Sequence, residues 1–102
     1  MEDARPGPDH GGPMDDASVG AILASIGAQV RAARQRRHWH LSHVAERLHL
    51  SASVVCRLEL ARREPSVHQL LLVCALLGLR LSEVLRIAED EVFPLGGTPW
   101  TY

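Results

Sequence analysis

Two short amphipathic segments follow each other in this chain with only two residues between them. In the first, apolar residues recur at i, i+3, i+4 and i+7, the spacing of one helix face: Leu41, Val44, Ala45 and Leu48. The second begins after Ser51, a preferred N-cap residue, and gathers three apolar residues on one side: Val54, Val55 and Leu58. Because His49 and Leu50 leave room only for a tight turn, the two helices are expected to cross steeply.

The region upstream also predicts a helix, and no segment of the chain alternates between polar and apolar residues for long. The upstream helix is indicated by apolar residues spaced four apart: Ile22, Ile26 and Val30. It should end near Arg37 or His38. Its start is open, because Asp16 and Ser18 can both act as an N-cap.

Two further helices are expected downstream. Ser66 and Gln69 form a capping box that opens a fourth helix, and Gly78 is well placed to end it. Ser82 caps a short fifth helix that runs through about Ala88. The predicted fold is therefore all-α, with five helices and a helix-turn-helix formed by the second and third.

The composition divides the chain into three regions. Residues 1–19 are rich in proline, glycine and acidic residues and have little to bury, so we expect a disordered, flexible tail. Residues 20–88 are expected to form the helix-turn-helix domain, and residues 89–102 a C-terminal tail that holds three of the four aromatic residues. The longest apolar run, 70–79, has ten residues, against the roughly 20 that cross a bilayer, so no membrane association is expected.

The formal net charge of −1 conceals a segregation of charge along the chain. Residues 30–65 hold eight Arg and three Glu, a net charge of +5, whereas residues 1–29 carry −4 and residues 66–102 carry −2. A basic centre in an otherwise acidic chain points to a polyanionic partner.

From Ile26 to Leu85 the chain resembles the lambda-repressor-like, Xre/Cro type of DNA-binding domain, in register and without gaps. No single residue is specific, but the whole set fits at fixed spacing: Ile26, Gly27, Val30, Arg34, Val44, Ala45, Leu50, Ser51, Val55, Leu58, Glu59, Pro65, Ser66, Leu70, Leu77, Gly78, Leu81, Val84 and Leu85. The resemblance implies double-stranded DNA as the partner. It also implies an ion pair between Arg34 and Glu59 that joins the first helix to the end of the third.

The resemblance places the N-terminal half of the third helix in the major groove. Its outward positions match those that read bases in the family: Ala52, Ser53, Cys56 and Arg57. Arg57 is the strongest candidate, because a guanidinium can hold O6 and N7 of guanine together, which is worth about 1–3 kcal/mol of discrimination.

Contacts to the DNA backbone are expected on both sides of this helix. Arg62 and Arg63 match the family's phosphate-contacting loop, and the amino end of the second helix would direct free amides at another phosphate. The backbone set is His40, Leu41, Ser42, Ser51, Arg62 and Arg63.

The chain departs from the family pattern at four of its positions. His49 and Ala61 stand where the family usually has Gly, so His49 is expected to adopt a positive φ. Leu41 replaces a polar residue, and His40 is a weaker N-cap than Ser or Thr.

Other chemistry has little support in the sequence. Four histidines cluster without placing three on one helix face, so we expect no metal: His38, His40, His43 and His49. No phosphate-binding loop, nucleophile motif or carboxylate pair is present, so neither an enzyme nor a cofactor is expected. Cys56 and Cys74 are too few for a disulfide framework and suit the reducing cytoplasm, although Cys56 could act as a redox-sensitive thiol beside Arg57.

The fourth helix is more apolar than one buried face requires. Its expected core residues are Leu70, Leu71, Cys74 and Leu77. Four further apolar residues are then only partly accounted for by the core: Leu72, Val73, Leu76 and Leu79. We expect helices four and five and the tail to bind a second copy of the chain or a protein partner, through Leu72, Leu76, Val92, Phe93, Trp100 and Tyr102. The alternative is a monomer in which the tail folds back over Leu72 and Leu76.

These features together predict a sequence-specific transcriptional regulator of bacterial or phage type that binds an inverted repeat as a homodimer. Repression is the commoner mode for this fold, so it is expected here by analogy. The alternative is an antitoxin or a protein-interaction adaptor that uses the same fold and binds its partner through residues 89–102.

Overall fold

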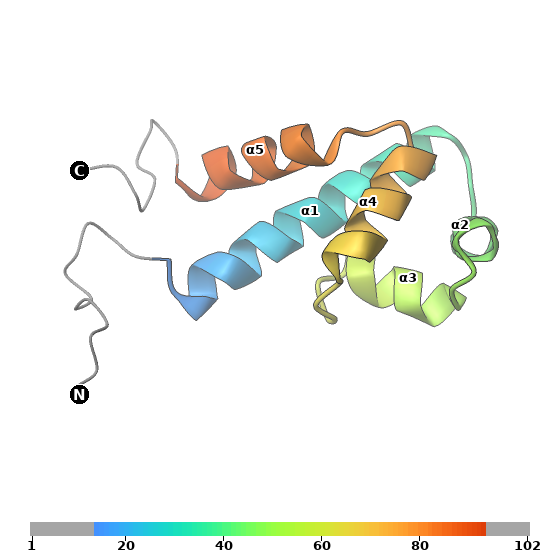
Figure 1. Cartoon of the computed structure of the whole chain (residues 1–102), viewed down its shortest axis with the longest axis horizontal. Helices are drawn as coiled ribbons and strands as arrows, with labels where there is room; N and C mark the ends of the chain where they lie inside the picture. Colours follow the sequence, from blue (N-terminus) through green and yellow to red (C-terminus); the bar gives the residue numbers. More distant parts are fainter. Residues whose placement is uncertain (1–13, 94–102) are drawn as a thin grey trace.

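The computed structural model describes residues 14–93 of the 102-residue chain. This part contains five helices and no strand (Figure 1): α1 (Asp16–Arg36), α2 (Leu41–Leu48), α3 (Ala52–Glu59), α4 (Val67–Leu76) and α5 (Leu81–Val92). The all-α fold with five helices and a helix-turn-helix, predicted from the sequence, is confirmed. The expected flexibility of the N-terminal tail, as well as Trp100 and Tyr102, falls on residues outside the described range.

Two helices differ from the expected bounds: α1 starts earlier, and α5 ends later. The N-cap of α1 is Asp15, whose side chain accepts a hydrogen bond of 2.8 Å from the Ser18 amide, so residues 16–19 are helical and not part of a tail. At the other end α5 continues to Val92, four residues past Ala88. Its N-cap is Arg80, without a side-chain cap, and not Ser82. Because α1 starts earlier than expected, the boundary between the N-terminal tail and the helical domain lies near residue 15.

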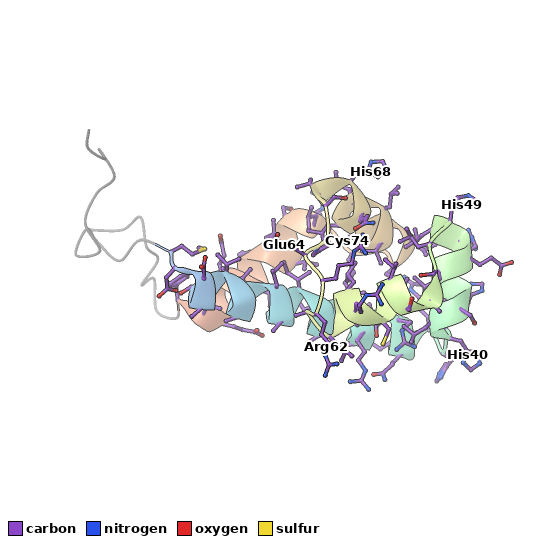
Figure 2. All side chains as sticks on the ribbon, turned by 90° about the horizontal axis from the view of Figure 1, so that it is seen from below. His40, His49, Arg62, Glu64, His68 and Cys74 are labelled. Carbon is purple, nitrogen blue, oxygen red and sulfur yellow. The ribbon has the colours of Figure 1, made fainter. Side chains whose placement is uncertain are left out.

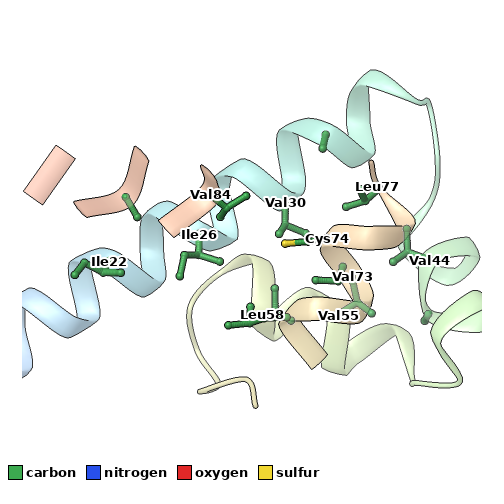
Figure 3. Packing of buried hydrophobic residues seen from close by; sticks show 14 residues of the cluster. Ile22, Ile26, Val30, Val44, Val55, Leu58, Val73, Cys74, Leu77 and Val84 are labelled. Atoms are coloured by element: carbon green, nitrogen blue, oxygen red, sulfur yellow. The ribbon is translucent and has the colours of Figure 1, made fainter. Parts of the chain in front are cut away.

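The long helix α1 forms the base of the fold. Figure 1 shows α5 running beside α1, with α4 crossing near its C-terminal half and α2 and α3 grouped at that same end. Every helix contributes to one hydrophobic core (Figure 3), which includes Val30 from α1, Val44 from α2, Val55 from α3, Cys74 from α4 and Val84 from α5. Because each of α2 and α3 has only eight residues, packing against this core stabilises them.

The sequence assignment of α4 was wrong at two positions. Val73 is only 1% exposed and belongs to the core, whereas Leu71, expected in the core, is 53% exposed. Buried residues recur at i, i+3, i+4 and i+7 around this helix: Leu70, Val73, Cys74 and Leu77. Leu71 lies outside that stripe.

Gly27 allows α1 to approach the end of α3 closely. A Cβ atom at this position would stand 2.7 Å from the Leu58 carbonyl oxygen and closer still to that of Glu59. Gly27 is buried, so a residue that weakens α1 as an isolated helix is required by its contact with α3.

Several chain turns use the left-handed backbone region. His49, which ends α2, has φ of 58°, as its position in place of a glycine led us to expect, and Ala61 has φ of 57°. Gly78 ends α4 with φ of 72°, and the capping box of Ser66 is present as predicted. His38 also has a positive φ, of 56°, which the sequence analysis did not anticipate.

Candidate nucleic-acid interface

The ion pair expected between α1 and α3 is present. Arg34 donates from Nε and Nη2 to the two carboxylate oxygens of Glu59, at 2.7 and 3.1 Å. Both side chains are largely buried, with 12% and 4% of their surface exposed. The hydrogen bond to Glu59 raises the pKa of the Arg34 guanidinium above its ordinary value. This two-point contact fixes the end of α3 relative to α1.

The face of α3 that points away from the core carries most of the residues proposed to read bases. Val55 and Leu58 are buried and hold the helix in place. On the other side Ala52, Ser53 and Arg57 are exposed. Cys56 is only half-buried, so it offers less surface than its neighbours.

Ser51 is engaged in capping α3. Its hydroxyl accepts a hydrogen bond of 3.2 Å from the Val54 amide, and its oxygen lies 3.2 Å from the hydroxyl oxygen of Ser53. Ser51 therefore orients Ser53 as well as starting the helix.

The amino end of α2 has no side-chain cap. His40 occupies the N-cap position with extended backbone and makes no capping hydrogen bond through its ring. Ser42 is exposed, whereas the Leu41 side chain is half-buried and packs against the core. The amide of Leu41, and not its side chain, is thus the group available to an anion at this helix end.

Two arginines follow the C-terminal end of α3. Arg62 and Arg63 are both exposed. Viewed onto α3, Arg62 and His40 lie toward one edge of the molecule, whereas His49 and His68 lie toward the other (Figure 2). The exposed face of α3 is thereby flanked on one side by a cation and by a helix N-terminus.

The surface expected to bind a second copy is only partly exposed. Leu72 is 42% exposed, whereas Leu76 is half-buried. Val92 and Phe93 are half-buried and pack against the core at the end of α5.

Sequence reasoning missed two residues near this site. The sequence analysis considered Arg37 only as a possible end of the first helix, and it gave Trp39 no role. Both make contacts between α1, α2 and α4, which are described below. Their signal in the sequence was weak, because an exposed arginine and a lone tryptophan in a connector have no helical periodicity.

Residues 14–93 offer no group of three or more metal-ligating side chains, and no helix among them is long and apolar enough to cross a membrane. The two cysteines in this range are free. Burial raises the pKa of the Cys74 thiol, which stands in the core.

A family model described as a helix-turn-helix domain matches residues 25–87, which is more than half of the chain. The match includes all of α2, α3 and α4 and coincides with the region whose residues resemble the lambda-repressor-like type. No curated protein matches the chain. On the strength of the family match and the geometry of α2 and α3, the chain belongs to the helix-turn-helix domain family.

Proposed function

We propose that this protein is a sequence-specific regulator of transcription that binds double-stranded DNA with α3 in the major groove. The observation that carries the proposal is the outward face of α3. It presents Ser53 and Arg57 to solvent, while the opposite face is fixed by the core and by the Arg34–Glu59 pair. A rigid helix that exposes an arginine is what direct readout of guanine requires.

The surroundings of α3 support the same proposal. Residues 30–65 hold a net charge of +5 in a chain whose net charge is −1. Arg62, Arg63 and the uncapped amino end of α2 flank the helix and can bind phosphates, which orients the protein on the duplex. We propose that Ala52 and Cys56 complete the base-reading surface. We also propose that the protein binds its DNA in the bacterial cytoplasm.

The proposal is tested by fluorescence anisotropy with the full chain. Labelled duplexes of about 30 base pairs, one set random and one from the DNA upstream of the gene, are titrated at about 50 and 200 mM salt. Tighter binding to the upstream DNA that weakens steeply with salt is expected. Arg57→Ala should abolish the preference for that DNA while non-specific binding persists.

The matched control is Arg86→Ala, which removes the same charge from α5. Figure 1 shows α5 on the side of α1 away from α3. This variant should keep the preference of the wild-type chain. Absence of binding to either duplex at tens of micromolar would contradict the proposal and favour a protein partner for this fold.

We further propose that the protein represses transcription as a homodimer on an inverted repeat. The exposed apolar side chains on α4 support a contact between copies: Val67, Leu71 and Leu72. No formally charged residue occurs within α4, so two copies can meet there without opposing like charges. Leu71 joins Leu72 in this proposal because the structure leaves it exposed.

Analytical ultracentrifugation tests the dimer separately from DNA binding. The chain is compared with Leu71→Gln, which keeps helix propensity, and with Ala24→Gln at an exposed position of α1. Dissociation by Leu71→Gln alone is expected. A chain truncated after Phe93 keeps α5 whole, and an unchanged dimer fraction in it would show that residues 94–102 take no part in the dimer.

A further inference from the structure

Residues 37–40 form the connector between α1 and α2, and the side chain of Arg37 links this connector to the end of α4. This side chain donates from Nη2 to the Leu77 carbonyl oxygen, at 2.7 Å, where α4 ends. The carbon at the centre of its guanidinium lies 5.3 Å from the centroid of the Trp39 ring, within the range of a cation–π contact. The side chain of Arg37, the C-cap residue of α1, thus contacts both the end of α4 and the Trp39 ring in the connector.

Trp39 in turn contacts α2. Its ring centroid is 4.7 Å from that of His43, which stands in the first turn of α2, and the two rings are tilted by 57°. The backbone of Trp39 is held as well, because its carbonyl oxygen accepts a hydrogen bond of 2.8 Å from Nη1 of Arg34. Since Arg34 also pairs with Glu59, the connector is linked to α3 by the same guanidinium.

Two local features show that this arrangement is specific. His38 adopts a left-handed backbone, which costs a residue with a Cβ roughly 1–2 kcal/mol, so the neighbouring contacts must hold it there. Gly78 leaves room for the guanidinium of Arg37, because a Cβ atom at Gly78 would stand 2.7 Å from its Nη2 atom. The tight end of α4 and the position of Arg37 therefore depend on each other.

We propose that Arg37 and Trp39 are positioning residues for DNA binding: they hold the amino end of α2 at the DNA surface without touching DNA. This inference rests on the proposed function. Although Arg37 is exposed, its guanidinium already binds the Leu77 carbonyl and covers the Trp39 ring. Its role is thus to fix the angle of α2, whose first-turn amides meet a phosphate, and not to supply that phosphate with a cation.

Salt dependence of DNA affinity separates positioning from direct contact. Each cation that neutralises a phosphate contributes about one unit to the slope of log K against log salt. Arg37→Gln should weaken binding by about tenfold or more, because a phosphate contact of α2 is misplaced. The matched control is Arg36→Gln, which removes a neighbouring charge of α1. The slope of log K against log salt should be the same in Arg37→Gln and Arg36→Gln, whereas Arg36→Gln should keep nearly full affinity.

Trp39 variants test the inference without any change of charge. Trp39→Ala should lose about tenfold in affinity at an unchanged salt slope, and Trp39→Phe, which keeps an aromatic face for Arg37, should recover most of it. In the free protein, hydrogen exchange of the α2 amides should accelerate in Trp39→Ala while that of α5 stays unchanged. This second measurement also shows that the variant is folded.

The outcomes are distinguishable from failure of the proposed function. If the wild-type chain binds no DNA, the proposed function and this inference are both overturned. If the wild type binds and Arg37→Gln lowers the salt slope by one unit more than Arg36→Gln, Arg37 contacts a phosphate itself and the positioning role is wrong. Wild-type affinity in Trp39→Ala would equally overturn it.

Discussion

Replacing Gly27 by alanine tests how closely α1 must approach α3. In the interior of a helix this change is stabilising by about 1 kcal/mol, because alanine loses less backbone entropy on folding. Here the new Cβ atom would stand 2.7 Å from the Leu58 carbonyl oxygen, whereas ordinary contact begins at 3.4 Å, so the helices must separate by at least 0.7 Å. The Glu59 carbonyl stands closer still, and both obstacles are backbone atoms that cannot rotate away.

Overpacking of this kind costs roughly 1–3 kcal/mol, and a contact with backbone belongs at the upper end of that range. After the gain in helix propensity, Gly27→Ala should destabilise the fold by about 1–2 kcal/mol. Gly20→Ala is the matched control, because a Cβ atom at Gly20 in the same helix would meet nothing within 4 Å. That variant should be more stable than the wild type by up to about 1 kcal/mol.

Urea denaturation followed by far-ultraviolet circular dichroism measures both free energies of unfolding. The two variants are expected to shift the midpoint in opposite directions at a similar m-value. Equal or greater stability of Gly27→Ala relative to Gly20→Ala would refute the reasoning, because α1 and α3 would then have room to spare. The displaced end of α3 also carries Glu59, so a weakened Arg34–Glu59 contact should accompany the loss of stability.

Three further predictions concern other parts of the fold. Glu59→Gln should destabilise the fold by about 3 kcal/mol in urea titrations, because the largely buried Arg34 loses its charged partner. The double variant Arg34→Met/Glu59→Leu should cost less than this single change, because no buried charge is then left unpaired. A larger loss of stability in the double variant would contradict this prediction. Ala61→Gly should raise the free energy of unfolding by roughly 0.5–1 kcal/mol, because glycine relieves a positive φ, and an unchanged midpoint would show that the turn is unstrained. The hydrogen bond from the Ser18 amide lowers the pKa of Asp15, so its stabilisation is present above the ordinary carboxylate pKa and is lost as the pH falls through the lowered value; the difference in unfolding free energy between wild type and Asp15→Asn, measured from about pH 6 to pH 2, should therefore shrink on acidification.

Local signals in the sequence were sufficient to locate all five helices. Ser51 and Ser66 are N-caps whose hydrogen bonds run to residues only three positions away. Gly78 ends α4 with a positive φ, and His49 takes the conformation that its place in a glycine position implied. These features depend on backbone geometry over one turn, so they are present in the sequence itself.

Helix lengths were less well predicted, because several residues near an end can satisfy the same local rule. Asp15 caps α1 one residue before the first candidate, Asp16. At the other end, Arg86 forms ion pairs with Glu83 and Asp90, one turn to either side, and such pairs favour continuation of α5 past Ala88.

The candidate site divides in the same way. The outward positions of α3 followed from periodicity, and the Arg34–Glu59 pair from the family resemblance. The hydrogen bond from Arg37 to Leu77 could not be predicted, because it joins residues 40 positions apart. The contacts of Trp39 could not be predicted either, because the connector has no repeating pattern.

The sequence by itself determined which segments are helices, since caps, turns and periodicity act within a few residues. The tertiary structure alone decided which face of α4 is buried. That helix is apolar nearly all round, so Val73 and Leu71 are equivalent until α2 and α5 pack against one side of it. Burial of Val73 and exposure of Leu71 is the outcome of close packing, in which only one rotation of α4 fills the space between its neighbours.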